Sequence, residues 1–287
     1  GKRCSNFLFR RLELGRIISK NNIDILVHTN IQTIDYKSAR QVVCISEAGK
    51  LSKAELERLK KYADEIFVHN NHDASVLKKL LLEKKIRVIP YGVSDNINKL
   101  SWSEKESTKK ELTGGSDYFL LYAQEATAQD LTIVLKAFSV FKKWNRTSIK
   151  LLLLVSAKNN KAANDTIRNY LFANEVVLLA DYTHKAENEW AGSAYGVVFL
   201  STSACLKGKM MNVLSMEVPL LLPQQPDLES MFETSACFYK NDINGLSAKL
   251  TLLYKDEVYR NQLVANGASF AAAASWKSVA ERFITAI

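Results

Sequence analysis

Short apolar runs alternate with helix-length amphipathic segments along most of this 287-residue chain. Residues 117–123 (DYFLLYA) and 148–156 (SIKLLLLVS) are apolar at consecutive positions, and the segment between them, 130–144, has apolar residues at helical spacing. A strand that is apolar at consecutive positions is buried on both faces, which is typical of a parallel sheet covered by helices. Parallel strands need right-handed crossover connections, so the pattern predicts doubly wound α/β domains.

The alternation falls into two blocks that are separated by a polar, charged segment at 95–116. This segment is expected to be a linker with a short helix. The predicted strands are 23–28, 40–46, 65–69 and 86–94 in the first block, and 117–123, 148–156, 176–181, 196–200 and 218–223 in the second. The predicted helices are 5–20, 52–64, 72–85, 130–144, 164–173, 185–194, 210–216, 244–256 and 275–287.

Composition indicates an ordinary globular protein, since 47% of the residues are hydrophobic and 24% are charged. The formal net charge of +9 permits anionic partners such as nucleotide phosphates or a phospholipid surface, although it also serves solubility alone. Nucleic acid is not an expected partner, because no zinc-finger spacing or RNA-recognition signature is present.

The four cysteines lie far apart and form no Cys-x-x-Cys pair, so reduced thiols in a cytoplasmic protein are expected, without a structural metal. No apolar run is long enough to cross a bilayer, and no signal peptide is visible. The sequence begins with Gly1-Lys2, so the natural N-terminus is open to question. The expected location is the cytoplasm, with the basic surface allowing peripheral contact with the inner face of the membrane.

The stretch 195–223 (YGVVFLSTSACLKGKMMNVLSMEVPLLLP) combines an apolar strand, a small polar loop, a helix and a second apolar strand. It resembles the donor-binding segment of the family 4 retaining glycosyltransferases, which have the GT-B fold. In that family two glutamates stand in this segment. When the sequences are aligned on Val218-Pro219, Ala204 and Asn212 occupy those two positions. The order of strand, loop, helix and strand favours the GT-B fold. The absence of both carboxylates argues against assuming glycosyltransferase activity.

Further segments resemble the same family in order and spacing. Residues 86–94 (IRVIPYGVS) resemble its interdomain signature, and Ser275-Trp276 resembles the pair before its last helix. The resemblance implies a GT-B-like protein with two parallel-sheet domains facing across a cleft. An acceptor-side domain at 1–94 would be shortened, a nucleotide-sugar domain would span 95–274, and the closing helix 275–287 would pack back on the first domain.

The resemblance also implies where a diphosphate would bind. Gln124 and Gln129 stand at the positions of the family's diphosphate-binding Arg and Lys. A glutamine donates hydrogen bonds but brings no charge, so diphosphate affinity should be lower; the alternative is that both are solvated loop residues. Lys207 and Lys209 flank Gly208 at the expected start of a helix, where they form either a phosphate pocket or an exposed turn.

Asn212 retains the ability to hydrogen-bond a ribose hydroxyl at the position of the second glutamate. In the first domain, Glu47 is a candidate base or electrostatic stabiliser, with helix capping as the competing interpretation. His28 is interpreted as a structural histidine. His69 and His72 have a spacing that suits metal ligands, but no third ligand is evident, so no metal is predicted.

Two hypotheses therefore remain. The first is a glycosyltransferase-like protein, related to hexosyltransferases of polysaccharide biosynthesis. Such enzymes transfer sugar from a nucleotide diphosphate sugar to a glycan or lipid-linked acceptor without a metal cofactor, and this chain would do so weakly or not at all. The second is a non-catalytic binding or scaffold protein derived from such an enzyme.

Overall fold

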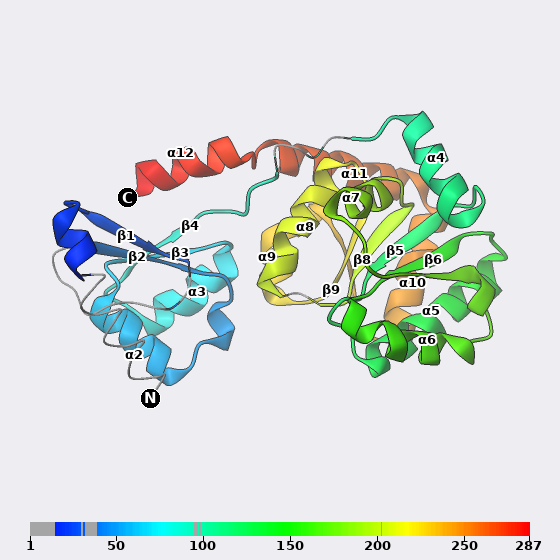
Figure 1. The fold of residues 1–287 in the computed structure, drawn as a ribbon, viewed down its shortest axis with the longest axis horizontal. Coiled ribbons are helices and arrows are strands. Elements are labelled where there is room, and N and C mark those ends of the chain that lie inside the picture. Colours follow the sequence, from blue (N-terminus) through cyan, green and yellow to red (C-terminus); the bar gives the residue numbers. More distant parts are fainter. Residues whose placement is uncertain (1–14, 30, 32–38, 95–96, 98, 202) are drawn as a thin grey trace. The chain divides into compact units, whose positions relative to one another are not determined.

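The computed structural model describes residues 15–29, 31, 39–94, 97, 99–201 and 203–287 (Figure 1). It contains two parallel β-sheets, which confirms the α/β prediction. The chain divides into two compact units: Gly1–Pro90 together with Val279–Ile287, and Tyr91–Ser278. Of the predicted helix at 5–20, residues 15–20 are helical and the rest lies outside the described residues.

The first unit is built on a four-stranded parallel sheet in the order β1-β2-β3-β4. Its strands are β1 (Ile25–His28), β2 (Arg40–Ile45), β3 (Glu65–Val68) and β4 (Lys85–Val88). Its helices are η1 (Ala48–Lys50), α2 (Lys53–Tyr62), α3 (Asn71–Leu80) and most of α12 (Trp276–Ala286). The order follows the sequence without reversal, so right-handed crossovers place α2 and α3 on the same face.

The two faces of this sheet are covered by parts of the chain that are distant in sequence. Ile66 and Val68 of β3 pack with α2 and α3, whereas Phe67 points to the other face. There the Phe67 ring meets Phe283 of α12 edge to face, with 4.9 Å between ring centroids. The closing helix therefore completes the core of the first unit, above the sheet in Figure 1.

A buried glutamate of the first unit has three cationic partners. Glu65 is 1% exposed and forms ion pairs with Arg40 (2.6 Å), Lys85 (2.6 Å) and Arg87 (3.1 Å). Burial acts to raise the pKa of the Glu65 carboxyl, but hydrogen bonds from Lys85 and Arg87 and the charge of Arg40 lower it overall. A buried carboxylate with three cationic partners is a fixed structural element of this unit.

The second unit is built on a six-stranded parallel sheet in the order β10-β9-β8-β5-β6-β7. Its strands are β5 (Tyr118–Tyr122), β6 (Lys150–Leu154), β7 (Val176–Leu179), β8 (Gly196–Phe199), β9 (Leu220–Pro223) and β10 (Cys237–Tyr239). From β5 the chain moves outward through β6 to β7, and it then returns to β8 on the other side of β5. The sheet therefore reverses direction between β5 and β8, as in other doubly wound folds.

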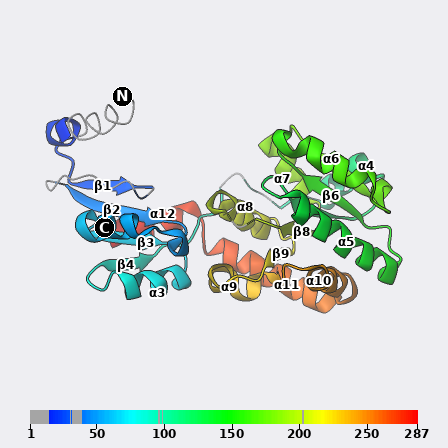
Figure 2. The same cartoon turned by 90° about the horizontal axis from the view of Figure 1, so that it is seen from below.

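Helices cover both faces of this sheet. They are α4 (Trp102–Thr113), α5 (Ala128–Asn145), α6 (Asn160–Arg168), α7 (His184–Gly192), α8 (Ala204–Ser215), α9 (Pro226–Phe232), α10 (Ile243–Lys255) and α11 (Glu257–Ala272), with short 3-10 turns η2 (Ala157–Asn159), η3 (Ala173–Glu175) and η4 (Glu233–Ser235). One face packs against α5 and α10, and the other packs against α8 and α9. Figure 2 shows α5 and α6 along one side of this unit.

Several element boundaries differ from the prediction. Helix α8 begins at Ala204 and not at Met210, because Leu206 and Met210 are both buried and extend its apolar face by one turn. Helix α3 begins at Asn71 and ends at Leu80, and its N-cap is Asn70, whose side chain accepts from the backbone N–H of Asp73. Helices α9 and α11 and strand β10 were not predicted.

Candidate functional site

The reversal between β5 and β8 marks the place where this kind of sheet binds ligands. The loops that follow adjacent strands at a switch point leave in opposite directions, and folds of this kind bind their ligands there, at the carboxyl ends of the strands. Here the two loops are 123–127, between β5 and α5, and 200–203, between β8 and α8. The residues of interest in the second unit come from these loops, from α7 and α8, and from the start of α9.

Glu125 joins the two loops. Its carboxylate accepts hydrogen bonds from the hydroxyls of Ser201 and of Ser203 (3.0 Å), and the Cys205 thiol lies 3.6 Å from the same carboxylate. Ser203 and Cys205 stand at the N-terminal end of α8, where the helix dipole favours a negative charge. An exposed carboxylate of this chain thus occupies the mouth of the switch point.

Gln124 is anchored beside this carboxylate. Its Nε2 donates to the hydroxyl of Tyr182 (2.8 Å), and its backbone oxygen accepts from Asn159 (3.0 Å). Its Oε1 is buried and has no hydrogen-bond partner in the described part of the chain. Burial raises the pKa of Tyr182, and the bond from Gln124 opposes that rise. Gln124 is therefore a fixed amide, whereas Gln129 is exposed in the first turn of α5.

Lys209 lies at the same edge of the sheet but already faces an anion. Its ammonium pairs with the Glu187 carboxylate and stands 5.5 Å from the centre of the Tyr122 ring. Glu187 is buried on α7 and also lies 3.4 Å from His184. Burial raises the pKa of Tyr122 well above its ordinary value, and the negative charge of Glu187 adds to the effect.

Lys207 is fully buried in α8. Its ammonium lies 3.0 Å from the Asp227 carboxylate, which stands in the first turn of α9. Because the Lys207 side chain is 0% exposed, a ligand reaches it only after the surrounding side chains move. Both lysines predicted to form a phosphate pocket are thus inside α8 and paired with carboxylates, and not on a turn before it.

Asn212 and Gly208 also belong to α8. The Asn212 Oδ1 accepts a hydrogen bond from the backbone N–H of Ser94 (3.2 Å), so the amide holds the segment that enters this unit. Gly208 is different, because a Cβ built at this position would meet no atom within 4 Å. The backbone at Gly208 therefore borders open space.

Glu47, the candidate residue of the first unit, is at the N-cap position of η1 but its side chain makes no capping hydrogen bond. Its carboxylate pairs instead with Lys50 (3.0 Å). The N–H of Ala48 is bound by Asp73, which is buried together with Asn70. The interpretation of Glu47 as a helix-capping side chain is therefore wrong.

His28 lies 3.1 Å from the Gln41 amide oxygen, and burial lowers its pKa.

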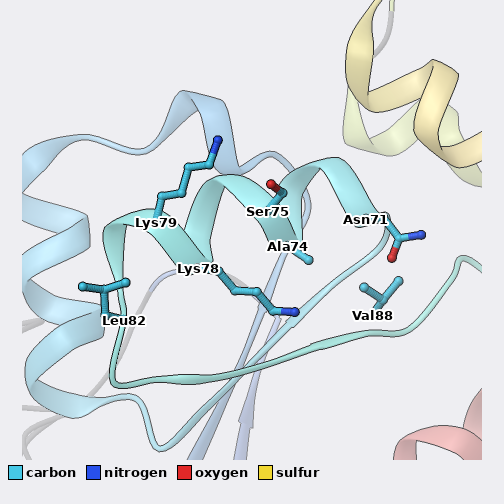
Figure 3. A pocket seen from close by; sticks show the side chains of 7 residues that line it. All are labelled: Asn71, Ala74, Ser75, Lys78, Lys79, Leu82 and Val88. Atoms are coloured by element: carbon cyan, nitrogen blue, oxygen red, sulfur yellow. The ribbon is translucent and has the colours of Figure 1, made fainter.

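A pocket of about 510 Å³ also lies on the first unit, between α3 and the edge strand β4 (Figure 3). Its lining includes Lys78, Lys79, Leu82 and Val88, and none of the predicted site residues takes part.

Within the described residues, no cluster of His, Cys, Asp and Glu could hold a metal ion. In the same part of the chain no helix is long and apolar enough to span a membrane.

Comparison with solved structures identifies the architecture. The chain matches sucrose-phosphate synthase from Thermosynechococcus elongatus with a TM-score of 0.77 and 13% identity, over 95% of this chain and 75% of that one. It matches a glycosyltransferase from Rickettsia africae with a TM-score of 0.78 and 12% identity, over 98% of this chain and 80% of the other. The chain has the GT-B fold.

A third match with this fold is HepE from Anabaena, solved in complex with UDP and glucose. The TM-score is 0.75 at 10% identity, over 97% of this chain and 82% of HepE. No protein-family model matches the sequence, and no curated protein is detectably similar to it in sequence. At these identities the matches show the fold alone, so the site must be argued from its own residues.

Several residues of this site were not predicted from the sequence, among them Glu125 with its partners Ser201, Ser203 and Cys205, and also Tyr182, Glu187 and Asp227. Glu125 carried a usable signal, because it follows the apolar run 117–123 by two positions, at the carboxyl end of a predicted parallel strand. Glu187 and Asp227 carried none, since a carboxylate in the first turn of a helix is ordinary. Their pairing with α8 depends on the tertiary structure.

Proposed function

We propose that the second unit binds a nucleotide diphosphate, with or without its sugar, at the switch point between β5 and β8. The observation that carries the proposal is that Gln124, Ser201 and Ser203 offer amide and hydroxyl groups from two loops that meet at the switch point, in a chain with the GT-B fold. HepE, which shares the fold, was solved with UDP, UDP-glucose, or UDP and glucose. UDP is therefore the first ligand to test.

The lineage that fits the motif frame at 195–223 is that of the family 4 retaining glycosyltransferases. An enzyme of that type would take the sugar from the nucleotide and pass it to a glycan or lipid-linked acceptor. The proposed acceptor-side domain is 1–94, with 95–274 as the donor-side domain. A peripheral contact with the cytoplasmic face of the membrane through the basic surface remains part of this proposal.

We expect transfer by this chain to be weak or absent. The departing diphosphate needs fixed positive charge, and removing one such preorganised contact typically costs on the order of 100- to 1000-fold in rate. Here the ammonium groups of Lys207 and Lys209 face Asp227 and Glu187, and Gln124 contributes an uncharged amide. These contacts leave a binding surface with little electrostatic preference for a leaving diphosphate.

The same contacts favour the second candidate function, a non-catalytic protein that binds a sugar nucleotide or a partner. Asn212 holds the Ser94 backbone, and a buried ion pair fixes α8 against α9. Side chains that are held in structural bonds can form a rigid binding surface, but they are not available to stabilise a transition state. The two candidates differ in turnover and share the binding site.

Calorimetric titration with UDP, UDP-glucose and uridine, followed by a sugar-transfer assay, tests the proposal. We expect UDP to bind with a high-micromolar dissociation constant and uridine more weakly. A Gln124→Ala variant should weaken UDP binding, whereas Gln129→Ala, which changes an exposed glutamine, serves as the matched comparison. Equal affinity for UDP and uridine would refute diphosphate recognition, and rapid sugar transfer would refute the expected loss of catalysis.

A further inference from the structure

Three features of the described residues stand outside the proposed ligand contacts: the groove on α3, the buried Glu65 cluster and the bridge made by Glu125. Nothing in the structure shows what would fill the groove, and the Glu65 cluster is satisfied by its own ion pairs. The bridge is different, because it joins the two loops between which the ligand of this fold would enter.

The bridge is formed by the Glu125 side chain and the hydroxyl and thiol groups that face it. Glu125 extends from the β5–α5 loop, and Ser201, Ser203 and Cys205 belong to the β8–α8 loop and the start of α8. The Ser203 hydroxyl makes no capping bond to α8; it donates to Glu125 and also lies 3.0 Å from the Cys205 thiol. The contacts of Glu125 therefore connect its own loop with the β8–α8 loop and the first turn of α8.

We infer that Glu125 is an autoinhibitory latch: its carboxylate holds the two loops together and must be released before an anionic ligand enters the switch point. The inference rests on the proposed function for the identity of the ligand. The carboxylate acts in two ways, because it uses the hydroxyls of Ser201 and Ser203 and also repels a diphosphate. Glu125 is exposed, so water can replace its contacts with Ser201, Ser203 and Cys205 when it swings out.

A latch reduces apparent affinity by the fraction of molecules that are open. If about one molecule in ten is open, removing the latch tightens binding about tenfold without adding any contact to the ligand. A residue that contacts the ligand directly would have the opposite effect, because its removal would weaken binding. The sign of the change in affinity therefore separates a latch from a ligand contact.

The experiment uses the whole chain and three variants. Glu125→Ala removes both the bridge and the charge, and the double variant Ser201→Ala with Ser203→Ala removes the bridge but keeps the charge. Glu111→Ala is the matched control, since Glu111 is an exposed glutamate near the C-terminal end of α4, which leads to the amino end of β5. UDP and inorganic pyrophosphate are titrated by calorimetry.

Hydrogen exchange without ligand tests the latch independently of binding. Peptides covering residues 200–206 should exchange at least threefold faster in both unlatched variants than in the wild-type chain or the Glu111→Ala control. Glu125→Ala should bind UDP and pyrophosphate about tenfold more tightly than wild type, and the double serine variant should show a smaller gain because the carboxylate is still present.

Unchanged exchange in the unlatched variants overturns the latch, and so does weaker UDP binding by Glu125→Ala, which would make Glu125 a ligand contact. The outcome for the proposed function is read separately. Faster exchange and tighter pyrophosphate binding, with no preference for UDP over pyrophosphate, would support the latch and refute nucleotide recognition. Equal UDP affinity in wild type and Glu125→Ala would leave nucleotide recognition standing and overturn the latch.

Discussion

Replacing Lys207 by Met should separate a structural lysine from a ligand-binding one. Methionine keeps most of the side-chain volume, so the main loss is the ion pair with Asp227 (3.0 Å). Breaking a buried pair from one side typically costs about 3–5 kcal/mol, because the other charge stays buried and unpaired. Since the Asp227 side chain is 22% exposed, water offsets part of this cost, and we expect about 2–3 kcal/mol.

Tryptophan fluorescence measures this loss in the second unit. All four tryptophans of the chain lie between residues 91 and 278, so their signal reports the unfolding of that unit. For a unit of this size, 2–3 kcal/mol corresponds to a fall in Tm of about 4–12 °C. Lys185→Met is the control: Lys185 is 87% exposed and 3.7 Å from Glu189, and such a surface pair contributes about 0.5 kcal/mol or less.

The double variant Lys207→Met with Asp227→Asn tests whether the loss of stability comes from the unpaired Asp227 charge. With both charges removed no buried charge is left unpaired, so most of the stability should return. A double variant as unstable as the single one would show that the pair is not the source of the effect. A single variant with unchanged Tm but weaker UDP binding would instead place Lys207 at the ligand, against its full burial.

Three further variants should change stability in a direction that the structure predicts. The ionised Glu65 carboxylate stabilises the first unit. This contribution is complete above pH 4.5, the ordinary pKa of the carboxyl, and is lost as the pH falls through its lowered native pKa. Glu65→Gln should remove it, which urea unfolding followed by circular dichroism between pH 3 and 7 measures. Gly92→Ala should lower Tm, because the new Cβ would lie 2.5 Å from the Trp276 ring. Gly208→Ala should instead raise the free energy of unfolding by about 0.5–1 kcal/mol, because Gly208 is inside a helix and its new Cβ would meet no atom within 4 Å. Equal Tm changes in the two glycine variants, or a Glu65→Gln variant with the wild-type pH dependence, would contradict these arguments.

The sheet of the second unit could be predicted because its strands are apolar at consecutive positions. Residues 117–123 and 148–156 contain β5 and β6, and a two-faced apolar strand has few alternatives once helices flank it. Helix α11 escaped prediction because its sequence, rich in alanine and polar residues, has no continuous apolar stripe. Strand β10 is only three residues long, too short for a periodic signal.

The site was harder to predict because its charges are paired across the fold. In sequence, the run Lys207-Gly208-Lys209 resembles a polar turn, which led to a predicted helix start that was too late. The run is helical and buries Lys207 because Asp227, twenty positions away, neutralises its charge. Local propensity contains no information about such a partner, so a buried lysine is indistinguishable from an exposed one until the two segments are brought together.

The pairing also changes where the basic character of this protein can act. Among the charged groups whose contacts are described above, Lys207 and Lys209 carry two positive charges, while Glu125, Glu187 and Asp227 carry three negative ones. The sum is −1, in a chain whose formal net charge is +9. The excess of positive charge therefore lies on other parts of the chain. It attracts anions to this site only through the long-range electrostatic field, which salt screens over about 8–10 Å. Under the proposed function, a diphosphate would bind there by replacing Glu125 at the start of α8, so we expect the affinity of the site to depend on how readily that side chain leaves.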